Sequence, residues 1–175
     1  MLDRLSDESI NKEYVLCKIV RYNNRPKMQN ESVAEHTCFV SVFCLKILQQ
    51  LKLDKETERQ VLVLAALHDL AETRTSDIPH DVKANYPEMI SILDMIEDDY
   101  YREEWPEYYN EVQKASPLAH AIVKMADTYS VIQYCYNERR LGNKSDVIEE
   151  ILMEANERLD FYMSEVNKLI EKEDK

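Results

Sequence analysis

Residues that form tight turns are scarce in this sequence. It contains one glycine, Gly142, and five prolines in 175 residues, whereas β-hairpins and short loops often need glycine or proline at their turns. Leu, Glu, Lys, Ala and Met, which favour helices, occur throughout. Hydrophobic residues make up 45% of the chain, enough to bury a sizeable core. The composition predicts an all-α protein, and the lack of repeats and linkers predicts one domain, residues 1–175.

Capping residues mark where the helices begin and end. Ser32 opens a capping box, Asp54 is an N-cap before an apolar run, and Ser116 stands before Pro117. Gly142 suits the left-handed residue that often follows a helix. The predicted helices span residues 6–20, 32–52, 54–72, 87–104, 116–141 and 145 onward, with one short turn of helix after Pro79.

The chain is strongly acidic, with a formal net charge of −12 and a pI near 4.8. Such a surface repels the phosphates of a nucleic acid at long range, so we expect no nucleic-acid polymer as a partner. A small anionic ligand is not excluded, because a metal ion or a few local cations outweigh the average field. No apolar run reaches about 18 residues and the first residues do not resemble a signal peptide, so we expect no membrane contact and a cytoplasmic location.

The four cysteines are Cys17, Cys38, Cys44 and Cys135. None belongs to a C-x-x-C pair, and each lies in an apolar helical context. We interpret all four as reduced, buried thiols of a cytoplasmic protein. Their spacing does not favour a zinc ion held by cysteine.

A metal site is suggested by polar residues in apolar surroundings. The pair His68-Asp69 ends an apolar helix, and such a pair alone is usually structural. His36 lies in the first turn of the preceding helix, and Asp127 lies inside the apolar run "IVKMADTYSVI". A buried carboxylate must be paired, neutral or metal-bound, because desolvating a free charge is costly. Two histidines and two aspartates on three helices suit one divalent ion such as Mn, Co, Zn or Mg.

Several short segments carry a family resemblance. They are "RY" at 21–22, "ESVAEH" at 31–36, "HDLAE" at 68–72, "SDIPHDVK" at 76–83 and "KMADTY" at 124–129. In this order the chain resembles the HD-domain phosphohydrolases, above all their YfbR-like 5′-deoxynucleotidase branch. Phage deoxynucleoside triphosphohydrolases have a similar core. The resemblance implies an HD-domain helical bundle with the metal site between its core helices.

The resemblance also implies roles for individual residues. Arg21 would hold the phosphate, since its guanidinium is a fixed bidentate donor. Glu72 would orient or deprotonate the attacking water, or protonate the leaving oxygen; if the helix continues that far, it shares a face with the His-Asp pair. The implied metal ligands are His36, His68, Asp69 and Asp127, of which His36, Asp69 and Asp127 would also contact the substrate.

The remaining matched residues would contact the nucleotide. Tyr22 offers an aromatic wall where the bacterial enzymes typically have tryptophan, which leaves the base preference open. Asp77 corresponds to a family residue near the sugar. His80 stands where the monophosphatase branch often has threonine, and it either contacts phosphate or caps the short helix after Pro79. Lys83 would meet further phosphates or is a surface lysine.

Two activities fit this set of ligands. The sequence favours a 5′-deoxynucleotidase, which converts a deoxynucleoside monophosphate and water to deoxynucleoside and phosphate. The alternative is a triphosphohydrolase, which releases triphosphate from a deoxynucleoside triphosphate. A non-catalytic nucleotide-binding module is the third hypothesis. The partner would be a small deoxynucleotide, and the resemblance implies a homodimer or larger homo-oligomer.

Overall fold

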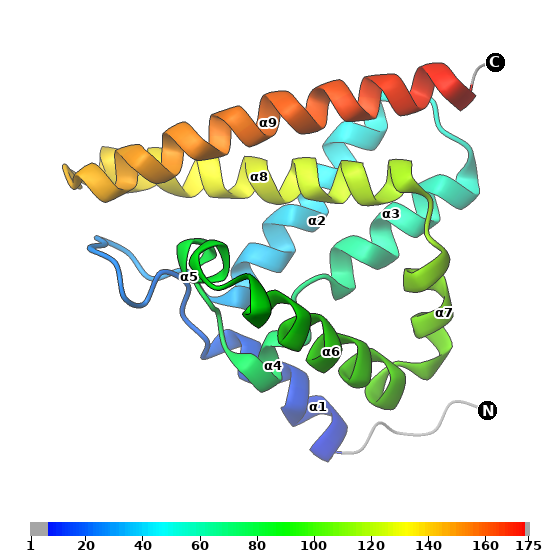
Figure 1. Cartoon of the computed structure of the whole chain (residues 1–175), viewed down its shortest axis with the longest axis horizontal. Helices are drawn as coiled ribbons and strands as arrows, with labels where there is room; N and C mark the ends of the chain where they lie inside the picture. Colours follow the sequence, from blue (N-terminus) through cyan, green and yellow to red (C-terminus); the bar gives the residue numbers. More distant parts are fainter. Residues whose placement is uncertain (1–6, 174–175) are drawn as a thin grey trace.

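The computed structural model describes residues 7–173, with the side chains of residues 7–10, 80, 81, 84 and 173 outside that description. Its regular structure is helical (Figure 1), which confirms the predicted all-α class. Within residues 7–173, β pairing is limited to one isolated antiparallel bridge, Val20 to Ser32. The elements are α1 (Asp7–Tyr14), the 3-10 turn η1 (Val15–Cys17), α2 (Val33–Gln50), α3 (Lys55–Leu67), α4 (Glu72–Thr75), α5 (His80–Asn85), α6 (Pro87–Glu104), α7 (Pro106–Lys114), α8 (Pro117–Arg140) and α9 (Asp146–Glu173).

Helix α8 lies at the centre of the molecule. Thirteen of its residues are buried, and it packs against α2, α3 and α9. In Figure 1, α9 runs along α8 in the opposite direction and α2 crosses it. Within residues 7–173, no helix is both long enough and apolar enough to cross a membrane. The main core includes Val40 and Cys44 of α2, Val61 and Ala65 of α3, Ile122 and Ala126 of α8, and Val166 of α9.

The predicted caps form as expected. Glu35 donates its backbone N–H to Ser32 Oγ at 3.2 Å, and its carboxylate accepts the Ser32 N–H at 2.7 Å. Asp54 accepts two backbone N–H bonds from the first turn of α3, at 2.9 and 3.1 Å. Ser116 caps α8 in the same way, and Gly142 follows it with a φ of +95°. These caps fix where α2, α3 and α8 begin, and so where their polar residues lie.

The N-terminal segment differs from the predicted helix over residues 6–20. Ser6 lies outside the described residues, and α1 ends at Tyr14. The chain then tightens into η1, where Lys18 donates its N–H to Val15 O at 2.8 Å. This tighter turn buries Leu16 against the second apolar cluster. Packing of one leucine therefore ends the helix earlier than the sequence pattern suggests.

The prediction that all four cysteines are buried is wrong for two of them. Cys44 and Cys135 are buried, but Cys17 and Cys38 are exposed, and all four are free thiols. The apolar context misled the prediction for Cys38, because α2 has an outer face that carries apolar side chains. Cys17 closes η1, whose buried residue is Leu16.

Candidate metal centre and substrate groove

The His-Asp pair lies in a turn rather than in a helix. Helix α3 ends at Leu67, and the next residues are joined by bonds between positions three apart, including Leu70 N to Leu67 O at 3.0 Å and Glu72 N to Asp69 O at 3.1 Å. Continuation of the helix to Glu72 was therefore a wrong expectation. The tighter turn still places all three side chains at one site, because His68, Asp69 and Glu72 line the same cavity.

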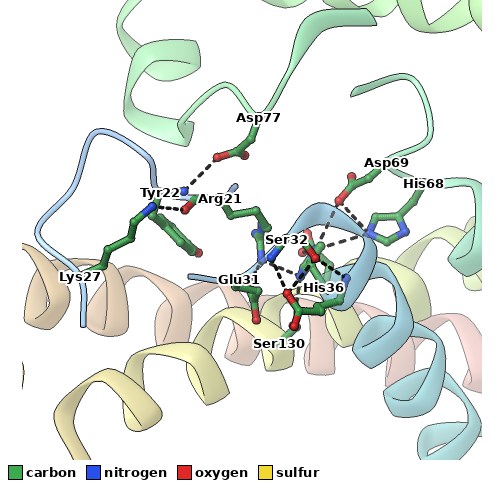
Figure 2. Close-up of polar contacts among 12 residues, drawn as sticks. Arg21, Tyr22, Lys27, Glu31, Ser32, His36, His68, Asp69, Asp77 and Ser130 are labelled. Carbon is green, nitrogen blue, oxygen red and sulfur yellow. Dashed lines mark hydrogen bonds and ion pairs between the residues drawn. The ribbon is translucent and has the colours of Figure 1, made fainter. Parts of the chain in front are cut away.

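The other three predicted ligands lie around the imidazole of His36, and Figure 2 shows two of them, His68 and Asp69. His36 Nε2 lies 3.1 Å from Asp127 Oδ1 and 3.4 Å from Asp69 Oδ2. It also lies 3.4 Å from His68 Nε2, which is itself 3.2 Å from Asp69 Oδ2. The first turn of α2, the turn after α3 and the middle of α8 each contribute to the cluster. The structure thus brings together all four residues predicted as ligands.

Hydrogen bonds on the far side of each ring orient the two histidines. His68 Nδ1 lies 2.8 Å from Ala65 O, and a carbonyl can only accept, so Nδ1 carries a proton and Nε2 faces the cluster. His36 Nδ1 lies 3.1 Å from Ser130 Oγ and 2.6 Å from Arg21 Nη1; since a guanidinium can only donate, this nitrogen accepts. Both rings therefore direct Nε2 at the cluster, as ligating histidines do.

The cluster is electrostatically suited to a cation. Burial alone would lower the pKa of His68, but the carboxylates of Asp69 and Asp127 outweigh it and raise that pKa to about 9. Burial would raise the pKa of both carboxyls, yet the facing imidazoles hold it well below its usual range. A site that attracts a proton this strongly also attracts a divalent ion.

The donor set and its spacing fit a metal ion. Ligands at about 2.1 Å from one ion lie roughly 3.0–3.4 Å from each other when the angle between them is near 90–110°. The separations around His36 Nε2, from 3.1 to 3.4 Å, fall in this range. His36, His68 and Asp69 offer ligand atoms within 4.8 Å of one another, and Asp127 approaches through its contact with His36. Mixed imidazole and carboxylate donors suit Zn, Mn and Co.

Arg21 extends into the site from the loop that precedes α2. Its Nη1 donates to Glu31 Oε2 at 2.8 Å and lies 2.6 Å from His36 Nδ1. Burial would lower the pKa of Arg21, but Tyr22, Glu31 and the aspartates of the cluster raise it above its usual value. The guanidinium is therefore a permanent cation directly beside the candidate metal centre.

Tyr22 and Asp77 form the wall next to Arg21. The Tyr22 N–H donates to Asp77 Oδ2 at 3.1 Å, and Tyr22 has a φ of 54°, rare for a residue other than glycine. Its ring stacks on Tyr134, with 4.5 Å between the ring centroids. The predicted aromatic wall is thus covered on one face by Tyr134, the Arg21 guanidinium lies 5.1 Å from the ring centroid, and Tyr22 lines the groove described below.

Glu72 is a buried carboxyl close to the cluster. Burial, together with the charges of Asp69 and Asp77, raises its pKa to about 8, against the opposing effect of Arg21 and Lys83. Its Oε2 is buried and has no hydrogen-bond partner among the described residues. A carboxyl that stays protonated near neutral pH and has an unused oxygen is suited to proton transfer.

Two cavities adjoin the cluster. The larger, a groove of about 550 Å³, contains Arg21, Tyr22, Asp77 and Asp127 and is closed on one side by α9. The smaller, of about 240 Å³, lies among α3, α6, α7 and α8. Both cavities share five lining residues, Asp69, Glu72, Ile78, Lys83 and Lys124, which therefore lie between them.

Sequence reasoning missed three cations that line the groove, Arg25, Lys124 and Arg158. Lys124 lies three residues before Asp127, one helical turn away on the same face of α8, so the matched segment "KMADTY" already contained the signal. Arg158 of α9 also lines the groove, and nothing in its local sequence indicated this. For His80, the structure gives the backbone at the start of α5, and its side chain lies outside the described residues.

Comparison with known proteins identifies the family. The sequence model of the family described as 5′-deoxynucleotidase YfbR-like matches residues 14–172. The chain belongs to this family. A relative, the 5′-deoxynucleotidase of Shewanella oneidensis, is 31% identical over 129 residues, which cover 66% of this chain and 66% of that enzyme.

Solved structures share the fold at low sequence identity. The HD phosphohydrolase DatZ of cyanophage S-2L, bound to dA and one catalytic Zn²⁺ ion, gives a TM-score of 0.70 at 23% identity over 98% of this chain and 99% of that chain. A conserved hypothetical protein from Pyrococcus furiosus gives 0.73 at 24% identity over 95% and 99%. An HD-domain phosphohydrolase from Listeria innocua gives 0.69 at 19% identity over 90% and 79%. The predicted HD-domain fold is thereby confirmed.

The raised pKa of Glu72 predicts a pH-dependent stability. In the metal-free protein, folding raises this pKa from 4.5 to about 8. The associated contribution to the free energy of unfolding is present below about pH 4.5 and is lost as the pH rises through about 8. Relative to Glu72→Gln, the wild type should therefore lose Tm between about pH 5 and pH 9. The exposed Glu171→Gln variant should show no such trend, and a pH-independent difference for Glu72→Gln would contradict the assignment.

Proposed function

We propose that this protein is a divalent-metal-dependent phosphohydrolase that removes phosphate from 5′-deoxynucleoside monophosphates. The observation that carries the proposal is the cluster of two imidazoles and two carboxylates with the carboxyl of Glu72 beside it. Family membership and the activity of the Shewanella oneidensis relative support the same reaction. DatZ, which shares the fold and is bound to dA and a catalytic Zn²⁺ ion, supports a deoxynucleoside ligand and a divalent metal.

One divalent ion, Mn, Co, Zn or Mg, would be held by His36, His68, Asp69 and Asp127. When bound, such an ion polarises a phosphoryl oxygen and lowers the pKa of water at the site. The substrate phosphate would also lie against His36, Asp69 and Asp127, because these three residues face the groove. With a divalent ion bound, its charge would balance the two carboxylates while the imidazoles are neutral. The site would then have a net charge near zero and would not repel a phosphate.

Arg21 and Glu72 would act on the phosphate from the protein side. The Arg21 guanidinium supplies two parallel N–H donors to phosphate oxygens and holds the phosphorus in place. The oxygen of water adds to phosphorus while the bond from phosphorus to O5′ breaks. Glu72, protonated near neutral pH, can give its proton to O5′ as that bond breaks. The products are deoxynucleoside and phosphate.

The sugar and base would lie toward Tyr22 and Asp77. Asp77 uses Oδ2 to hold the Tyr22 N–H, which leaves Oδ1 to accept a bond from a 3′-hydroxyl. A fixed backbone at this point forms a wall that can exclude a 2′-hydroxyl. His80, at the start of α5, is proposed as a further substrate contact.

The second candidate function is triphosphohydrolysis of deoxynucleoside triphosphates. The observation that favours it is the position of Lys83 and Lys124, which line both the groove and the smaller cavity beside the cluster. Two ammonium groups there can neutralise the β- and γ-phosphates of a substrate whose α-phosphate lies at the cluster. The same ligands and the same Arg21 serve both reactions.

We also propose that residues 1–175 form one HD domain that associates with copies of itself. Helix α2 carries three large apolar side chains on its outer face, Phe39, Val42 and Leu45, which are 52%, 41% and 49% exposed. Contiguous apolar surface of this kind is typical of subunit interfaces. This face supports a homodimer or a larger homo-oligomer.

A product assay distinguishes the candidate functions. The protein is stripped of metal with a chelator, reloaded with Mn, Co, Zn or Mg, and supplied with deoxynucleoside mono- and triphosphates and ribonucleoside monophosphates. We expect metal-dependent release of phosphate from the deoxynucleoside monophosphates and slower release from the ribonucleotides. Release of triphosphate from the triphosphates would establish the alternative, and absence of any turnover would leave a non-catalytic binding module.

The matched variants for this assay are Asp127→Asn and Asp160→Asn. Asp127→Asn should lose metal, measured by elemental analysis, together with turnover. Asp160 is exposed on α9, so its variant should retain both.

Replacing Lys124 should separate the two substrates. With Lys124→Met, we expect hydrolysis of any triphosphate to fall roughly 10- to 100-fold in kcat/KM, the size of a lost charge-assisted contact. Hydrolysis of monophosphates should fall by less than about threefold, because their single phosphate lies at the cluster. Lys52→Met, at an exposed position, is the control. Equal losses on both substrates would show that Lys124 does not distinguish them.

Replacing Leu45 tests the proposed interface. Leu45→Glu should shift the sedimentation coefficient to that of a smaller species, because a charge is buried if the face stays covered. Met95→Glu, on the exposed side of α6, should leave the assembly unchanged. A single monomeric species in the wild type would exclude the interface.

A further inference from the structure

The loop between η1 and α2 carries Arg21 and Tyr22, yet it has no regular secondary structure from residue 21 to residue 31. Its base is closed by Arg21 N, which donates to Glu31 O at 2.9 Å. Lys27 Nζ reaches back to Arg21 O at 3.3 Å, as Figure 2 shows. A segment of this kind needs contacts with the helices to hold a guanidinium in one place.

The contact at the tip of this loop is a buried carboxylate on α8. Glu138 has no exposed surface. Its Oε2 accepts the Met28 N–H at 2.7 Å, and its Oε1 accepts the Gln29 N–H at 2.9 Å. Two consecutive backbone N–H groups of the loop are thus held by one side chain.

Asn143 completes the arrangement from the end of α8. Its Nδ2 donates to Glu138 Oε2 at 2.6 Å and to Pro26 O at 3.1 Å. Gly142, with its positive φ, turns the chain so that Asn143 lies beside the helix it has just left. Both oxygens of Glu138 act only as acceptors, the pattern of an ionised carboxylate.

The same side of α8 also holds the start of the loop. Tyr134 lies one helical turn before Glu138, and its ring stacks on Tyr22. The loop is therefore fixed at two points on α8, by a ring stack next to Arg21 and by a carboxylate at residues 28 and 29. Tyr134 and Glu138 both follow Asp127 along α8 and are not part of the metal cluster. Any effect of these two side chains on the position of Arg21 is therefore transmitted through the loop.

We propose that Glu138 is a positioning residue for substrate binding. Its carboxylate fixes the tip of the loop over residues 26–29, and the loop in turn fixes Arg21 beside the metal cluster. A neutral side chain of the same shape cannot replace it, because an amide presents one NH₂ group to a site built from three N–H donors. The kinetic part of this inference rests on the proposed phosphohydrolase activity, whereas the ordering of the loop does not.

The test is Glu138→Gln, with Glu171→Gln as the exposed control. Hydrogen exchange followed by mass spectrometry or NMR should show faster exchange of the backbone amides of Met28 and Gln29 in Glu138→Gln. Metal content and the absorption spectrum of bound Co²⁺ should match the wild type, because the cluster is untouched. We expect kcat/KM for the deoxynucleotide to fall by roughly 10- to 100-fold, mostly through KM, as for a misplaced binding group.

A double-variant cycle isolates the route through Arg21. If Glu138 acts by placing this guanidinium, Glu138→Gln should lower kcat/KM by less than about twofold in an Arg21→Met background. Asn143→Ala, which removes the bond to Pro26 O and one donor to Glu138, should give a smaller effect of the same kind. It keeps the proposal testable if Glu138→Gln does not fold.

Two results would overturn the proposal. One is unchanged exchange at the amides of Met28 and Gln29 in both loop variants. The other is a loss of kcat/KM that is equal with and without Arg21. An inactive wild type would refute the proposed function, while faster exchange at these amides in the same protein would still support the anchoring of the loop by Glu138.

Discussion

Two carboxylates and two imidazoles meet in the interior of the protein, and the packing of the surrounding helices holds them in contact. Without a cation or protonated imidazoles, Asp69 and Asp127 would repel each other in a medium where charges are poorly screened. Their positions are fixed by three segments that lie far apart in the sequence: the capped start of α2, the turn after α3 and the middle of α8. The burial of α8 among α2, α3 and α9 therefore does more than fill a core, because it brings the four side chains within 3.4 Å of a neighbour.

The charge of the cluster affects the pKa of the ionisable side chains next to it. Burial and the carboxylate of Asp69 raise the pKa of Glu72, so a glutamate one turn away stays protonated where the aspartate is ionised. Arg21 supplies the opposite charge from a loop and has Glu31 as its own partner. The acid and the anion are both carboxyls and thus differ through their surroundings, as is usual where proton transfer is catalysed.

In the proposed function, the choice of substrate depends on the residues that surround the cluster rather than on the metal ligands themselves. The ligands and Arg21 fit a phosphate regardless of what else the substrate carries. In the proposed function the nucleoside would lie in the groove, while Lys83 and Lys124 line both the groove and the second cavity. The net charge of the protein is −12, yet Arg21, Lys83 and Lys124 lie where phosphates are expected. At short range the charges of these side chains outweigh the screened charge of the distant surface.

The sequence by itself determined the all-α class, the caps at Ser32, Asp54 and Ser116, and the likeness to the HD phosphohydrolases, because these depend on local patterns of a few residues. It also supplied the four residues of the cluster, although their assembly was only implied by the resemblance. The tertiary structure decided the rest. Four features depend on which segments pack together: the tight turn at His68, the early end of α1, the exposure of Cys38 and the anchoring of the loop by Glu138. In the last of these, Met28 and Glu138 lie 110 positions apart, so no local sequence pattern shows their contact.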